Sequence, residues 1–128
     1  MSKSNYLENK LLDHALGTAA FTAPSNVYLG LFTSDPADDA SGTELSGNGY
    51  ARVAVTFNAS SSGSATGPTS TTEFTASGGN FGNVTHFAIF DALTSGNMLF
   101  HGSLTSAKTI SDGDTLRFAA ASITITED

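Results

Sequence analysis

The sequence predicts an all-β fold, an antiparallel β-sandwich of jelly-roll type with one N-terminal α-helix, in a single domain over residues 1–128. Apolar and polar residues alternate with the period of a strand in several separate segments, most clearly over residues 83–104. Helical spacing of apolar residues is confined to residues 5–16. The chain also lacks an internal repeat and any stretch typical of an interdomain linker.

Residues 83–104 are predicted to form the central hairpin, with its turn at Ser95-Gly96-Asn97. Successive strand residues point to opposite faces. The first arm therefore places Val84, His86, Ala88 and Phe90 on one side, and Thr85, Phe87, Ile89 and Asp91 on the other. Because both sides are largely apolar, we expect this arm to be an inner strand that is covered on both faces.

The helix predicted over residues 5–16 carries an apolar stripe, formed by Leu7, Leu11, Leu12, Ala15 and Leu16. Asn5 followed by Glu8 resembles a capping box, and Gly17 is suited to the left-handed turn that ends a helix. The favoured interpretation is a helix folded onto its own sheet. The alternative is a docking helix for a neighbouring subunit.

Residues 27–32 are predicted to form a strand, in which Gly30 indicates the close approach of a neighbouring backbone or side chain. The following segment, residues 33–49, is polar and contains four acids, Asp35, Asp38, Asp39 and Glu44. Oxygen ligands suit calcium, but the EF-hand spacing is absent. We therefore interpret these acids as turn residues, with a calcium loop as the alternative.

Residues 50–57 alternate cleanly and predict a half-buried strand, with Ala51, Val53, Val55 and Phe57 facing inward. Arg52 lies on the opposite face. We expect it to form a surface ion pair with an acid of the preceding loop, or with an acid of a partner subunit.

Residues 58–80 are predicted to form a long, variable Ser/Gly-rich loop, with a short strand at residues 73–75. After a turn at Ser106 and Ala107, a short strand over residues 108–110 and the Asp112-Gly113 turn predict a second hairpin. In the last segment, residues 115–126, the inward face changes near three consecutive alanines, which indicates a bulge.

Composition narrows the class of function. Twelve acidic residues against five Lys and Arg give a formal charge of −7, which opposes binding to phosphate and makes nucleic acid an unexpected partner. The absence of cysteine excludes thiolate metal sites and cysteine nucleophiles. Apolar runs fall short of the roughly 18 to 20 residues that span a bilayer, and an export pattern is lacking. We therefore expect a soluble protein without a membrane partner.

Patterns typical of catalysis are missing. His14, His86 and His101 invite a metal or acid–base interpretation, yet carboxylates near them in the sequence are few, so we interpret them as structural. The chain contains no G-x-S-x-G motif and no complete phosphate loop, and it has no tryptophan to line a sugar groove. We predict a non-enzymatic protein with no cofactor and no metal.

Five phrases, in this order, resemble a widespread family of small tailed-bacteriophage virion proteins that are commonly labelled phage tail fibre proteins. They are YLENKLLDHALG, VYLGLFTSDPAD, GTELSGNGYARVAVTF, NVTHFAIFDALTSGNMLFHGSL and KTISDGDTLRFAAASITI. The resemblance covers nearly the whole chain, except residues 59–72. It implies a structural role in the virion, after synthesis in the host cytoplasm, and supplies no catalytic residues.

A compact, non-repetitive module favours a capsid decoration or cement protein on the particle exterior. The alternative is a tail fibre, collar or tail-associated subunit that binds the host. Residues 60–72 would then form the loop that recognises a host receptor or glycan. The expected partners are other virion proteins, either the major capsid protein or tail and collar subunits, and sister copies in a trimer or dimer. The candidate subunit-contact residues are Leu7, Leu11, Leu16, Arg52, Phe74 and Phe81.

Overall fold

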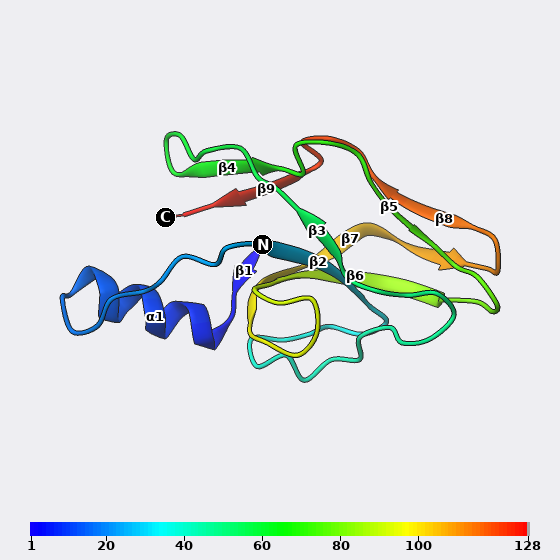
Figure 1. Ribbon diagram of the computed structural model, residues 1–128, viewed down its shortest axis with the longest axis horizontal. Helices are drawn as coiled ribbons and strands as arrows, with labels where there is room; N and C mark the ends of the chain where they lie inside the picture. The colour runs from blue at the N-terminus through cyan, green and yellow to red at the C-terminus, as the bar shows by residue number, and fades with distance from the viewer. Residues whose placement is uncertain (128) are drawn as a thin grey trace.

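One helix and nine strands form within residues 1–127, the part of the chain that the computed structural model describes. In chain order they are β1 (Ser2–Lys3), α1 (Asn5–Ala15), β2 (Val27–Phe32), β3 (Val53–Val55), β4 (Ser64–Gly67), β5 (Thr72–Thr75), β6 (Gly82–Phe90), β7 (Met98–Ile110), β8 (Thr115–Phe118) and β9 (Ile123–Thr126). The predicted class is confirmed: the protein is all-β, with antiparallel, sandwich-like layers and one N-terminal helix (Figure 1).

The main sheet has five antiparallel strands in the order β1-β7-β6-β2-β3. The hairpin predicted at residues 83–104 is confirmed as β6 and β7, which are joined by residues 91–97. β7 is longer than predicted, because it runs on to Ile110 without a turn at Ser106 and Ala107. The extra residues form a bulge: Val84 faces Lys108, whereas His86, only two residues on, faces Ser103.

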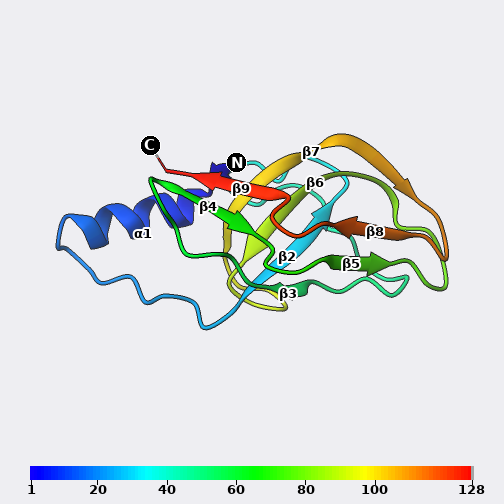
Figure 2. The ribbon, with the colours of Figure 1, turned by 90° about the horizontal axis from the view of Figure 1, so that it is seen from above.

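The second layer consists of two ribbons, β4 with β9 and β5 with β8, which lie over one face of the main sheet (Figures 1 and 2). Both ribbons use residues from the segment 58–80, so the prediction of a long loop there is wrong, while the strand predicted at residues 73–75 is confirmed. Threonine has a high strand propensity. The partner strands, β8 and β9, lie far along the chain, where a local pattern cannot reveal them.

The core fills the space between the two layers. It contains Leu29 and Leu31 of β2, Phe87 and Ile89 of β6, Phe74 of β5, Leu116 and Phe118 of β8, and Ile123 of β9. A turn separates β8 from β9, and Ala121 in this turn has a positive φ of 60°. The predicted change of face at the alanines is therefore confirmed, but the predicted bulge is wrong, because residues 119–122 form a turn between two strands that belong to different ribbons. Because of this turn, both strands direct their apolar residues into one core.

A smaller apolar cluster covers the opposite face of the main sheet. It consists of Phe32, Ala88, Phe90 and Met98. β6 is therefore covered on both faces, as predicted. The assignment of Val84 to the side of Ala88 and Phe90 is wrong, because the bulge after Val84 turns this residue to the core face with Phe87 and Ile89.

Two other strand predictions need correction. The strand expected over residues 50–57 is a strand only at Val53–Val55, because residues 50–52 do not pair with β2 and the ladder begins where Val53 faces Leu29. Ala51, predicted to face inward, is exposed. The Asp112-Gly113 turn forms, with φ of +86° at Gly113, but the strands it joins do not pair with each other. The turn instead carries the chain from the main sheet into the second layer, where β8 pairs with β5.

Helix α1 confirms the predicted helix to within one residue, but its N-cap is Ser4 and not Asn5. The Ser4 hydroxyl oxygen accepts a hydrogen bond from the Leu7 amide at 3.2 Å, and the hydroxyl donates to the Met98 carbonyl. Gly17, with φ of +78°, follows the C-terminus as predicted. The helix extends beyond the layers (Figure 2), and its one buried residue is Leu7. Among the described residues, no helix has the length and apolarity needed to cross a membrane.

Candidate functional site

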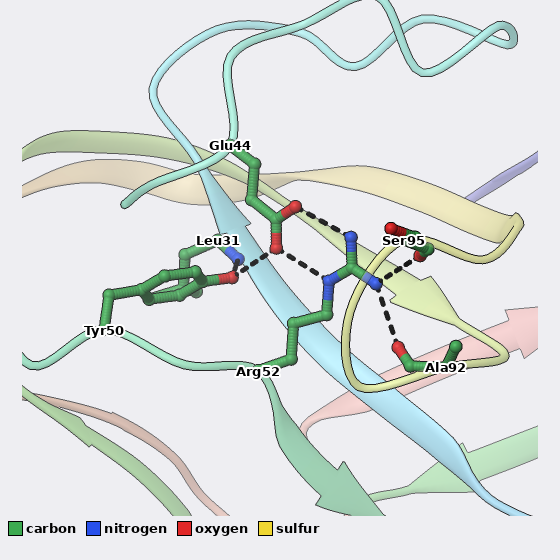
Figure 3. Close-up of polar contacts among 6 residues, drawn as sticks. All are labelled: Leu31, Glu44, Tyr50, Arg52, Ala92 and Ser95. Atoms are coloured by element: carbon green, nitrogen blue, oxygen red, sulfur yellow. Dashed lines mark hydrogen bonds and ion pairs between the residues drawn. The ribbon is translucent and has the colours of Figure 1, made fainter. Parts of the chain in front are cut away.

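Arg52 clamps two loops at one end of the main sheet (Figure 3). Its Nε and Nη2 atoms each donate to one carboxylate oxygen of Glu44, both at 2.8 Å, in a bidentate pair. Its Nη1 atom donates to the carbonyls of Ala92, at 2.9 Å, and Ser95, at 2.8 Å. The guanidinium carbon lies 3.5 Å from the centre of the Phe90 ring. The loop of residues 33–49 is thereby fixed to the loop of residues 91–97.

Tyr50 completes the clamp. Its hydroxyl donates to Glu44 at 2.7 Å and accepts from the Leu31 amide at 3.0 Å. The phenol thus satisfies the Leu31 amide, while the Leu31 carbonyl accepts a hydrogen bond from the Leu45 amide at 3.0 Å. Burial, and then the hydrogen bond to Glu44, raises the pKa of the Tyr50 hydroxyl. The hydroxyl therefore remains a neutral donor over the physiological range.

The clamp lies directly against Gly30. A Cβ atom at this position would meet Glu44 Oε1 and Phe90 Cε2 at 3.1 Å and the Tyr50 hydroxyl at 3.2 Å. The predicted close approach at Gly30 is therefore confirmed. The predicted pairing of Arg52 with an acid of the preceding loop is confirmed as well, but the pair is not a surface pair, because the Arg52 side chain is only 8% exposed.

The acids of residues 33–42 hold turns and attach this loop to the sheet. Asp35 accepts from the Ala37 amide at 2.9 Å and Asp39 from the Ser41 amide at 3.0 Å. Hydrogen bonds from Ser41 lower the pKa of Asp39. These contacts are those of turn residues, the interpretation favoured from the sequence. Asp38 has a further role that the sequence did not reveal: its carboxylate lies 2.8 Å from Nε2 of His101.

The two strand histidines lie on the same face of the hairpin, offset diagonally, because His86 faces Ser103 and His101 faces Ala88. His86 Nδ1 lies 2.7 Å from the Thr85 hydroxyl. Within residues 1–127 there is no group of three or more His, Asp or Glu residues that could hold a metal ion.

Helix α1, residues 38–40 and the loop 91–97 converge at this end of the molecule, which we call the end surface. The Asn5 amide donates to the Asp38 carbonyl at 2.9 Å, and the Ser4 amide donates to the Leu99 carbonyl at 2.9 Å. Two exposed leucines lie further along α1, where the helix extends beyond the layers (Figure 2): Leu12 is 58% exposed and Leu16 74%. Leu93, in the loop 91–97, is 51% exposed.

The six candidate contact residues are distributed between the core and the surface. Leu7, Phe74 and Phe81 are buried in the chain itself, and Arg52 is engaged in the clamp. Leu11 is half-buried, and Leu16 is exposed on α1. Their role as contacts stays a prediction, for which Leu16 is the most accessible.

Sequence reasoning did not select Leu12 or Leu93 as contacts. Leu12 belongs to the stripe it identified, while the isolated Leu93 gives no periodic signal.

The fold and the end surface define a β-sandwich module that presents loops and a helix, without a described metal site. Residues 2–126 match the family model of the podophage GP4 fiber I protein gp80, and the chain belongs to this family. The resemblance to phage tail fibre proteins is thereby confirmed, and membership implies a place in the virion. A comparison with curated proteins finds no match.

Proposed function

We propose that this protein is a non-enzymatic structural subunit of a phage tail fibre or tail-associated assembly, and that it acts by binding other virion proteins. The observation that carries the proposal is the match of residues 2–126 to a phage fibre protein family. Sequence analysis favoured capsid decoration over the fibre alternative. The family description supports the fibre alternative better, so we propose the tail position first.

The geometry supports contact rather than chemistry. The Arg52 clamp and the Asp38–His101 contact fix the loops of the end surface, so that ordering them adds little entropic cost when a partner binds. The exposed leucines of α1 and of the loop 91–97 supply apolar area for the centre of an interface. Copies arranged as a trimer or dimer would add their contacts through avidity.

Labelling the chain on intact particles tests the position. An affinity tag on this protein, visualised by electron microscopy with a bound antibody, should mark the tail. Particles that lack the protein should adsorb poorly to the host and keep their resistance to heat and osmotic shock. A label spread over the capsid, with heat-sensitive particles that still adsorb, would replace the tail proposal with decoration.

Substitutions on α1 test the end surface. Replacing both Leu12 and Leu16 with serine should leave the folding of the isolated chain unchanged within about 0.5 kcal/mol, because both side chains are exposed. Incorporation into particles should fall. Asn9→Ser is the matched control, since Asn9 is an exposed polar residue of the same helix. Equal incorporation of the double variant and the control would remove α1 from the proposed interface.

A further inference from the structure

The two layers are joined along one side and open along the other. On the joined side, beyond β3, the Asn58 amide donates to the Thr66 carbonyl at 2.9 Å, and the Thr69 amide donates to the Thr56 carbonyl at 2.9 Å. On the opposite side, β7 lies at the border of the main sheet, facing β8 and β9 (Figure 2). No strand ladder within residues 1–127 connects β7 to β8 or β9.

A groove of about 470 Å³ runs along this open side, between β7 and the ribbon strands β8 and β9. Its apolar lining comes largely from the core and consists of Phe87, Leu104, Leu116, Phe118 and Ile123. Met1 also lines the groove. An added strand could therefore place every second side chain against the apolar residues of the existing core.

The outer border of β7 already carries a short strand. In β1, Ser2 pairs with His101 and Lys3 with Phe100, and the Ser4 amide donates to the Leu99 carbonyl at 2.9 Å. In an antiparallel ladder every second residue directs its amide and carbonyl to the same neighbour, so Leu99, His101 and Ser103 face outward. β1 ends at Ser2. From Ser103 onward, no strand of residues 1–127 lies on this side of β7.

Charge indicates the chemistry of an occupant. The chain has only five Lys and Arg residues, and two of them, Lys108 and Arg117, line the groove, although Arg117 is already paired with Glu73. A third, Lys3, lies on β1 beside it and pairs with Glu127. Lys108 belongs to none of the ion pairs found among residues 1–127, so in a protein with a formal charge of −7 it favours a segment that places an acidic residue beside it.

We propose that this groove receives an extended segment of a neighbouring virion protein, which pairs with β7 as an added strand from Ser103 onward. The segment runs antiparallel to β7, in the direction of β1, with apolar residues at every second position and an acidic residue near Lys108. Backbone hydrogen bonds supply affinity, and the apolar lining sets the register. This inference rests on the proposed function, because it requires the chain to be assembled in a particle.

Two substitutions at one position test strand addition. Ser103→Pro removes the outward amide, whereas Ser103→Ala keeps it and serves as the matched control. Both isolated chains should show the circular dichroism spectrum of the wild type, since the lost amide does not face β6. Incorporation into purified particles should fall about tenfold for Ser103→Pro and stay at the wild-type level for Ser103→Ala. Equal incorporation of the two variants overturns the inference.

A photo-crosslinking residue provides a second measurement that does not depend on the folding of the proline variant. Placed at Thr105 of β7 and irradiated in intact particles, it should link to an extended segment that peptide mass spectrometry assigns to another virion protein. A link to a second copy of this chain would overturn the choice of occupant. Placed at Thr75, an exposed residue of β5, it should give little product. Equal yields at the two positions overturn the inference alone. Absence of the wild-type chain from particles overturns the proposed function with it.

Discussion

Arg52 holds both carboxylate oxygens of Glu44, at 2.8 Å each, with its own side chain only 8% exposed. The pair joins a loop that leaves β2 to the segment that enters β3, and Arg52 continues to the loop between β6 and β7. The same chain offers a contrasting pair, Arg117 with Glu73, whose side chains are 63% and 47% exposed. Comparing the two pairs separates the effect of burial on stability from the effect of the charges themselves.

Replacing Arg52 with methionine should lower the free energy of unfolding by about 3 kcal/mol, because Glu44 would be left without its partner in a partly buried site. Arg117→Met, the matched control, should change it by less than about 1 kcal/mol, because solvent screens an exposed pair. Urea unfolding of both variants measures the difference. Similar values for the two would mean that the clamp does not hold the loops.

Tyr50→Phe should lower the free energy of unfolding by about 1–3 kcal/mol at neutral pH, since the Leu31 amide loses its acceptor. The raised pKa of Tyr50 also predicts a pH dependence. Above about pH 10 the unfolded chain releases this phenolic proton while the folded chain keeps it, so stability falls as pH rises. Unfolding measured from neutral to alkaline pH should show a steeper decline for the wild type than for Tyr50→Phe. Parallel curves would contradict the prediction.

Gly30→Ala should lower the free energy of unfolding by about 1–3 kcal/mol, because its Cβ would crowd the Glu44 carboxylate and the Phe90 ring. Gly102→Ala is the control within a strand of the same sheet, where the nearest atom, in the flexible Met1 side chain, lies at 3.3 Å. Thermal unfolding should therefore separate the two variants. An unchanged melting temperature for Gly30→Ala would show that the side chains around Gly30 shift to accommodate a methyl group without loss of stability.

Ser4→Ala should cost about 1–2 kcal/mol, because the variant loses the N-cap of α1 together with the hydrogen bond to the Met98 carbonyl. Asn5→Ala, one residue further along, should change stability by no more than about 0.5 kcal/mol, since Asn5 is exposed. Chemical unfolding of the two variants compares them directly. A larger loss of stability for Asn5→Ala would indicate that Asn5, the residue suggested by the sequence pattern, is the N-cap.

The period of the apolar residues was sufficient to predict the fold class, the helix and the central hairpin. Each of these depends on neighbours close in sequence, as in residues 83–104, where alternation and a turn occur together. The change of face at the alanines followed from the same local period. The close approach at Gly30 was predicted from a glycine inside an apolar strand, although the side chains that approach it come from distant positions. Family membership also followed from the sequence, because a run of phrases in order is specific even where each phrase is weak.

Tertiary structure alone decided which distant segments meet. β4 pairs with β9 and Asp38 meets His101 across long stretches of chain, and no local period records such pairings. The bulge opposite Thr85 reversed the side on which Val84 lies, since a register shift alters the facing of every residue beyond it. Burial likewise separated the enclosed Leu7 from the exposed Leu16 on a single helical stripe, because a sequence period defines a face without showing how far the rest of the molecule extends over it.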